Sequence, residues 1–390
     1  MHTQYFHGAV DGAGRPLSFS VSGGLFAHFS IEETPVARPG SVDLGGYVLL
    51  PPLVDGHIHL DKSFVGDRWH PHQRAADLRG RLALEKQAMA AAAPMVDRAE
   101  ALIRQVVAFG TQRVRCHVDI DASTGLSHLH AVQAAHARCP DLLDIQYVAF
   151  PQAGVISCPG TAEVLQAAMD AGVAVIGGID PDALDGDAAG QLDLVFGLAD
   201  RHGVRVDIHL HEPDEQGMRQ LLRICERTRA LGLQGRVAVS HAYALGEVPP
   251  ARALQVGERL ADAQVAIMTN APGDRPFPPV SALHAQGVCL FAGNDNIRDC
   301  WWPWGNGDLL QRAMLVGYRS GFTTDAELQL ALDMVTINAD RVLGTQQEPM
   351  RAGATASFVA VRADNAVAAV AAVPAQRLSM RAGRWLVGPG

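Results

Sequence analysis

The chain has 390 residues, of which 48% are hydrophobic and 19% charged, and its formal net charge at pH 7 is −9. This composition supports one large domain or two smaller ones with a sizeable core, and it excludes a disordered chain. The acidic balance argues against a nucleic-acid partner, and no apolar run approaches the ~20 residues that a membrane helix needs. The six cysteines are scattered without a CxxC pair and the N-terminus lacks a signal-peptide pattern, so we expect reduced thiols in a cytoplasmic protein without membrane contact.

Both ends of the chain predict short antiparallel strands, because short apolar stretches alternate there with Gly, Pro and Asp turns. The N-terminal part comprises residues 1–49 and the C-terminal part residues 345–390. We expect these two parts to pair into one small β-sandwich domain, which flanks a longer middle region of residues 50–344.

The middle region repeats a short apolar segment followed by a helix-like stretch rich in Ala, Leu and Arg. After a first interval of roughly 60 residues, the segments recur about every 25 to 35 residues, which is the length of a βα unit. Near-continuous apolar strands are typical of parallel sheets, and eight such units predict an α/β fold of the (β/α)8 TIM-barrel type. The segments are VLLPPLVDGHIH, RVRCHVDID, DIQYVAFPQ, AVIGGID, VRVDIHLHE, RVAVSHA, QVAIMTN and VCLFAGND.

Nearly every segment ends in side chains that can bind or ionise. All strands of such a barrel end at the same face, where active sites are built, so polar residues at these ends favour an active site. The residues are His57, His59, His117, Asp119, Gln152, Asp180, His209, His211, Glu212, His241, Asn270, Asp295 and Asn296. By contrast, His128, His130 and His136 lie in a helix-like stretch and are predicted to be surface residues.

The first segment ends in an HxH pair, His57 and His59, and residues two apart in a strand share a face. Two imidazoles on one face can begin a site for a divalent metal such as zinc or iron(II), with room for a water. His209 and Asp295, at the ends of the fifth and eighth segments, are the best candidates for further ligands.

Hydrolytic chemistry also needs a proton carrier and a group that polarises the attacked bond. Glu212, three residues past the histidine of the fifth segment, is predicted as the proton shuttle, and His241 as the polarising group. A two-metal barrel of this type usually bridges its ions with a carboxylated lysine at the end of the fourth strand. Neither of the two lysines is near that position, so one divalent ion is predicted, although Asp180 or His211 could add a second.

In combination, the motifs resemble the amidohydrolase superfamily, and within it the cytosine deaminase branch, which also contains N-alkylamino-triazine hydrolases. The motifs are HIHLDK, AFPQ, DIHLHE, VSH and GNDN followed by WWPWG, in order through nearly the whole chain. The metal ligands that the resemblance implies are His57, His59, His209 and Asp295. It also implies Glu212 as the proton shuttle and His241 beside the attacking water. For the substrate, it implies a hydrogen bond from Gln152 to a heterocycle and a packing contact with Trp301.

Two departures from that branch concern the substrate. Asn296 stands where cytosine deaminases carry an aspartate directly after the metal aspartate, so the ring edge that is recognised should differ. His211 replaces an acidic residue beside the predicted shuttle. The only basic residues just past the strand ends that carry site residues are Lys62 and Arg298. We therefore expect no cluster of basic side chains that would bind a strongly anionic substrate.

We therefore expect a hydrolytic deaminase of a cytosine-like or related amino-substituted nitrogen heterocycle, in which a metal-activated water attacks the ring carbon that bears the amine. Two alternatives stay open: a hydrolase that releases an alkylamine from an N-alkylamino-triazine or opens a cyclic amide, and an inactive barrel that only binds small molecules. The motifs of a zinc nucleoside-type deaminase and of a serine hydrolase are absent. Trp301 is expected to stack on the ring, and Trp302 and Trp304 to pack in the core. The oligomeric state stays open, a homo-oligomer included.

Overall fold

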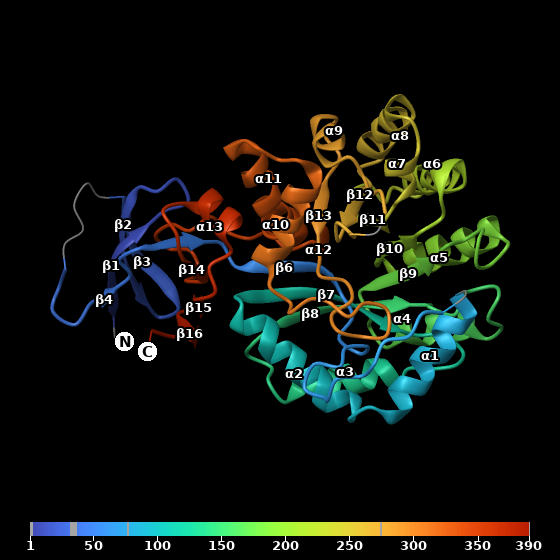
Figure 1. The fold of residues 1–390 in the computed structure, drawn as a ribbon, viewed down its shortest axis with the longest axis horizontal. Helices are drawn as coiled ribbons and strands as arrows, with labels where there is room; N and C mark the ends of the chain where they lie inside the picture. Colours follow the sequence, from blue (N-terminus) through green and yellow to red (C-terminus); the bar gives the residue numbers. More distant parts are fainter. Residues whose placement is uncertain (1–2, 32–36, 76–77, 274, 390) are drawn as a thin grey trace.

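The computed structural model describes residues 3–31, 37–75, 78–273 and 275–389. Its strands form two sheets, which Figure 1 shows as two bodies side by side along the long axis of the molecule. The larger body is a barrel ringed by helices, and the smaller is a β domain that holds both chain ends (Figure 1). Among the described helices, none has the length and apolar character that a membrane crossing requires. All six cysteines are free.

The larger sheet is a parallel (β/α)8 barrel, as predicted. Its strand order is β13-β12-β11-β10-β9-β8-β7-β6, which follows the chain. A parallel bridge between Ile58 and Asp295 joins the first strand to the last, and the backbone N–H of Asp295 donates to the carbonyl of His57 at 2.8 Å. Each predicted apolar segment contributes one strand to the barrel: β6 (Leu53–Ile58), β7 (Thr111–Asp119), β8 (Asp144–Phe150), β9 (Val175–Ile179), β10 (Arg205–Leu210), β11 (Val237–His241), β12 (Ala266–Thr269) and β13 (Leu290–Ala292).

Helices alternate with the barrel strands and cover their outer side (Figure 1). The barrel strands are therefore buried on both faces, which is why they read as continuous apolar runs. Side chains cap several helix ends: Asp187 accepts from the backbone N–H of Gly190 at the start of α5, and Thr324 forms a capping box with Glu327 at the start of α11. The helices are α1 (Leu78–Ala91), α2 (Met95–Ala108), α3 (Ser127–Ala137), α4 (Thr161–Asp170), α5 (Ala188–His202), α6 (Asp214–Ala230), α7 (Ala244–Glu247), α8 (Pro250–Asp262), α9 (Val280–Ala285), α10 (Leu309–Ser320), α11 (Asp325–Met334), α12 (Ile337–Leu343) and α13 (Ala366–Ala372).

Helix α12 plugs the bottom of the barrel, at the N-terminal ends of the strands. Its Val342 and Leu343 pack against inward-facing apolar residues of the strands, such as Phe291. The last carbonyls of a helix have no partner within it. Here Arg115 Nη2 donates to the carbonyl of Val342 at 2.7 Å, and Gln146 Nε2 donates to that of Leu343 at 2.8 Å. The polar strand ends that the sequence singled out lie at the opposite end of the barrel.

The strands of both chain ends form one β domain, as predicted. They are hydrogen-bonded in one sheet of order β16-β15-β14-β5-β1-β2-β3, with β4 paired to β1. Phe19 of β2 and Phe358 of β14 are three strands apart in this sheet. If the sheet were flat, a distance of about 14 Å would separate the two strands. Their ring centroids lie only 5.5 Å apart, so the sheet curls around an aromatic core. The strands are β1 (Gln4–Val10), β2 (Pro16–Ser22), β3 (Leu25–Ile31), β4 (Val42–Asp43), β5 (Tyr47–Leu50), β14 (Phe358–Arg362), β15 (Arg377–Arg381) and β16 (Arg384–Val387).

Candidate metal centre and active site

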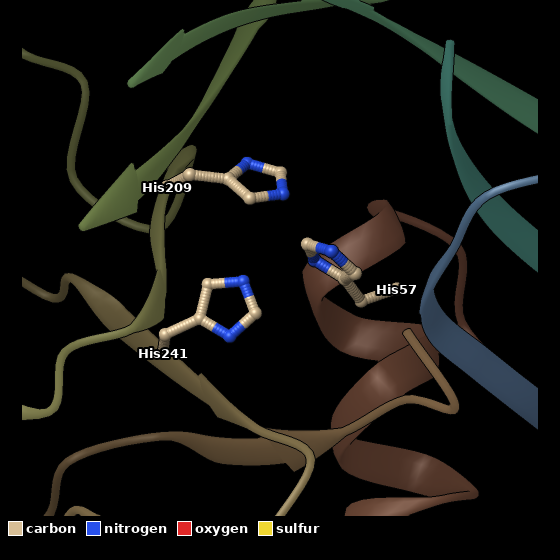
Figure 2. Close-up of side chains that lie close together, drawn as sticks. All are labelled: His57, His209 and His241. Atoms are coloured by element: carbon tan, nitrogen blue, oxygen red, sulfur yellow. The ribbon is translucent and has the colours of Figure 1, made fainter. Parts of the chain in front are cut away.

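Five ionisable side chains converge at the C-terminal mouth of the barrel, from or just past the ends of β6, β10, β11 and β13. Ring nitrogens of His57, His209 and His241 lie within 4.8 Å of one another, and Figure 2 shows the three rings around a common space. His57, His59 and Asp295 form a second group within the same limit. The structure thus brings together the four predicted metal ligands and the predicted polarising histidine.

The spacing of these groups suits a metal ion. Oδ1 of Asp295 lies 3.4 Å from Nε2 of His57 and 3.3 Å from Nε2 of His59. Two ligand atoms that each bind zinc at about 2.1 Å in a tetrahedral arrangement lie about 3.4 Å apart. Nε2 of His57 and both ring nitrogens of His209 are buried without a hydrogen-bond partner among the described residues. Buried polar atoms without a partner are costly, so these nitrogens fit the role of ligands to a divalent ion.

The electrostatics favour the protonation states that metal ligands need, which are neutral imidazole and ionised carboxylate. Burial holds the pKa of His209 and of His241 well below the ordinary value, and the neighbouring histidines lower it further. Burial alone would raise the pKa of Asp295, but the nearby imidazoles of His241, His57 and His59 hold it well below its usual range. His241 and Asp295 also adopt left-handed backbone conformations, with φ of 72° and 59°. Such strained conformations cluster at functional sites.

A chain of buried hydrogen bonds inside the barrel orients His57. Its Nδ1 lies 2.9 Å from Oγ of Ser240, which donates to Oδ1 of Asp207 at 2.7 Å. Asp207 in turn accepts from Nη1 of Arg115 at 2.8 Å. Because the hydroxyl proton goes to Asp207, Oγ can accept the Nδ1 proton of His57, which leaves Nε2 free to bind a metal. The sequence pattern did not predict these partners, although Asp207 lies two residues before His209 and therefore on the same face of β10.

We expect the Ser240→Ala variant to fold normally and to bind its metal about 10- to 100-fold more weakly, because the partner that fixes the His57 ring is lost. Metal transfer to a competing chelator measures this affinity. Ser127→Ala is the matched control, because Ser127 is exposed at the start of α3 and its hydroxyl caps only a local carbonyl. Equal chelator resistance in the Ser240→Ala and wild-type proteins would contradict the positioning role.

The candidate metal ligands lie at a cavity of about 750 Å³, a size typical of small-molecule sites. Its wall includes the predicted substrate residues Gln152, Asn296 and Trp301. The Gln152 amide is held at both ends, since Oε1 accepts from Nζ of Lys62 and Nε2 donates to Oε2 of Glu85 at 2.7 Å. Oε1 of Glu85 also accepts from the indole of Trp301 at 2.8 Å. Glu85 therefore connects the two predicted substrate residues, and its position on α1, far from any strand end, is why sequence spacing did not reveal it.

Two expectations about the cavity wall are wrong. Trp302 and Trp304, expected in the core, both line the cavity, and Trp304 is 68% exposed. The second concerns charge, since Lys62 and Arg298 were the basic residues expected near the strand ends. Arg298 does not line the cavity, but more basic side chains line it than the strand ends predicted. Its basic residues are Lys62, Arg81, Arg275, Arg312 and Arg319. The four arginines come from α1, α10 and the loop after β12, so only the folded chain brings them to the mouth.

The two candidate proton carriers are placed differently. Glu212 is buried and does not line the cavity; its Oε1 accepts from the backbone N–H groups of Asp182 and Ala183 at 2.7 and 2.9 Å. His211 does line the cavity, and its Nδ1 lies 2.9 Å from Oδ2 of Asp180. Burial would lower the pKa of His211, but the Asp180 carboxylate raises it above its ordinary value. The role of Glu212 as the shuttle stays a prediction, and neither Asp180 nor His211 belongs to the metal-capable groups among the described residues.

The expectation that His128 is a surface residue is also wrong. Its side chain on α3 is only 20% exposed, and its Nδ1 lies 2.9 Å from Oδ2 of the fully buried Asp61. Asp61, Asp119 and His128 form a further group of atoms within 4.8 Å. Nζ of Lys62 lies 2.9 Å from Asp119, so each of the two carboxylates has a basic side chain beside it. Burial lowers the pKa of His128, but Asp61 raises it above its ordinary value. This cluster is an ion-pair network that holds Lys62 at the cavity wall.

Comparison with known proteins decides the family. Residues 65–386 match the amidohydrolase family. The chain is 32% identical to the N-isopropylammelide isopropyl amidohydrolase of Pseudomonas sp. (strain ADP) over 320 residues, which cover 78% of this chain and 77% of that protein. The chain belongs to the amidohydrolase family. This amidohydrolase is therefore a hydrolase of carbon–nitrogen bonds, and the predicted superfamily is confirmed.

Solved structures support the predicted branch of the family. The N-isopropylammelide isopropylaminohydrolase of Burkholderia multivorans ATCC 17616 is 37% identical, with a TM-score of 0.91 and coverage of 99% of this chain and 98% of that one. The 5-methylcytosine deaminase of Klebsiella pneumoniae, liganded with 5-fluorocytosine, is 26% identical, with a TM-score of 0.89 and the same coverage. The amidohydrolase thus resembles both kinds of enzyme that the motifs indicated.

Proposed function

We propose that this amidohydrolase removes an alkylamino or amino group from a nitrogen heterocycle that carries oxo groups, by hydrolysis. The observation that carries the proposal is the convergence of His57, His59, His209 and Asp295 in a cavity of small-molecule size. The higher identity to the isopropylaminohydrolase, 37% against 26% for the deaminase, favours release of a short alkylamine. The second candidate is deamination of a cytosine-like ring, favoured by the deaminase that binds 5-fluorocytosine.

The proposed cofactor is one zinc or iron(II) ion held by His57, His59, His209 and Asp295. Such an ion would supply a Lewis acid and lower the pKa of a water at the site. A single ion is proposed because Lys62 pairs with Asp119, beside β7, and no other lysine is available near the end of β9.

The protein's own residues would handle the proton and the ring. We place proton transfer on His211, because it lies in the cavity wall and the Asp180 carboxylate both orients its ring and favours its charged form. Glu212 would hold the loop that carries Asp180 through the two backbone N–H groups it accepts. His241, with its ring nitrogens among the metal-capable groups, would polarise the attacked bond.

The proposed substrate is flat and weakly acidic. Trp301 offers a stacking plane, and Lys62 lies under its ring at 5.8 Å from the centroid. The basic wall suits oxo groups and ring N–H groups that share negative charge. Asn296 donates through Nδ2 to Oδ2 of Asp299 at 2.6 Å, which leaves its carbonyl oxygen and one N–H to read the ring edge.

A substrate screen of the metal-loaded enzyme tests the proposal. The panel comprises oxo-triazines with N-alkylamino or amino groups, cytosine and related pyrimidines, and cyclic amides without an amino group. We expect alkylamine or ammonia release, with the highest kcat/KM for an oxo-triazine that carries a short alkylamino group. Preference for cytosine would favour the second candidate, and turnover of the cyclic amides alone would contradict both.

A further inference from the structure

A second cavity lies at the plugged end of the barrel, opposite the metal centre. It has a volume of about 260 Å³, and its walls come from the beginnings of β10, β11 and β12, from the end of α8 and from α12. Four of its lining side chains are arginines: Arg115, Arg205, Arg236 and Arg341. Among the described residues that line it there is no Asp or Glu. Aliphatic residues such as Val237 and Leu260 complete the wall.

The charge of this cavity is largely uncompensated. Arg115 is paired with Asp207 at 2.8 Å, but within the described part of the chain Arg205, Arg236 and Arg341 form no salt bridge. Two of them donate to backbone carbonyls instead: Arg205 Nη1 to Gly235 at 2.9 Å, and Arg236 Nη2 to Gly203 and Val204. The exposed Arg341 lies beside the thiol of Cys289. A guanidinium has five N–H donors, so each of these side chains keeps donors for a ligand.

The arginines also repel one another. Burial lowers the pKa of Arg205, and the charges of Arg115 and Arg236 lower it further. Like charges in a small, partly buried space are unfavourable unless an anion joins them.

We propose that this cavity binds a small multivalent oxyanion through Arg205, Arg236 and Arg341. Planar guanidinium groups match phosphate and carboxylate oxygens with paired hydrogen bonds, and arginine is over-represented where such groups are recognised. The volume admits inorganic phosphate or a short dicarboxylate. The site lies at the other end of the barrel from the metal centre, so it is separate from the substrate cavity.

Titration calorimetry of the full-length, metal-loaded enzyme with inorganic phosphate and with succinate, at constant ionic strength set by sodium chloride, tests the site. We expect saturable binding of at least one of the two anions. Tighter binding of phosphate assigns a phosphate-type ligand, and tighter binding of succinate a carboxylate-type ligand. Arg236→Gln should weaken the binding by about tenfold or more, because a charged hydrogen-bonding partner is lost.

Arg205→Gln provides a second variant with the same expected loss of affinity, should Arg236→Gln fold poorly. Arg115 is not substituted, because it pairs with Asp207, which accepts the hydrogen bond from Ser240. Arg252→Gln is the matched control, since Arg252 lies on α8 but is paired with Glu215 and lies outside the cavity. The control should bind as the wild type does. Absence of saturable binding in the wild type, or equal affinity in the folded Arg236→Gln or Arg205→Gln variant, would overturn the proposal.

Discussion

The His57→Ala variant is expected to lose both its bound metal and its turnover. Two of the metal-capable groups that contain His57 are completed by residues of the proposed site, one by His209 and His241 and the other by His59 and Asp295. Its removal therefore takes away the ligand that the two groups share. Metal content after purification without added metal, measured by elemental analysis, should fall from about one equivalent to near zero. Turnover should fall at least about 100-fold, as the water is no longer activated.

The matched control is His130→Ala, because His130 is an exposed histidine of α3 outside the site. This control should keep both its metal and its activity. Retention of a full equivalent of metal by His57→Ala would contradict the assignment of the metal centre.

The His211→Asn variant is expected to keep its metal and to lose about 10²–10⁴-fold in kcat, the usual contribution of a general acid–base group. The Glu212→Gln variant should lose much less. A glutamine Oε1 at that position can still accept the backbone N–H groups of Asp182 and Ala183 that Glu212 holds. Steady-state kinetics on the best substrate of the screen, with metal content measured in parallel, compare the two variants.

The opposite order would contradict the role of His211. A large loss of kcat in Glu212→Gln, with near-normal kcat in His211→Asn, would show that Glu212 transfers the proton, as the sequence predicts. Asp180→Asn separates a positioning effect from a catalytic one. Without the Asp180 carboxylate, His211 should keep its place in the wall but lose the charge that raises its pKa, so kcat should fall less than in His211→Asn.

The barrel and the metal ligands could be predicted because both depend on local spacing. A strand buried on both faces must be apolar throughout, and its C-terminal end must carry the chemistry. His57 and His59 could therefore be paired by the strand period alone. His209 and Asp295 followed from their positions at the ends of the fifth and eighth segments. A small β domain built from both chain ends was predicted for a similar reason, from the short apolar stretches there, but the curl of its single sheet was not.

The remaining parts of the site depend on contacts that spacing does not encode. Glu85 reaches Gln152 and Trp301 from α1, and Arg312 reaches the cavity from α10, so neither sits at a strand end. Trp304 was expected to pack in the core between the last strand and its helix, yet its loop leaves it exposed at the cavity. Glu212 and His211 are adjacent in the sequence, and only the folded chain shows that one is buried and the other lines the cavity.

The product formed by the metal-loaded enzyme in ¹⁸O-labelled water tests the proposed function most directly. The substrate is the best compound of the screen, and mass spectrometry follows both the ring and the released amine. We predict an intact ring in which one ¹⁸O atom has replaced the amine, with an equal amount of free alkylamine or ammonia. A ring-opened product that gains a water without losing the amine would contradict it.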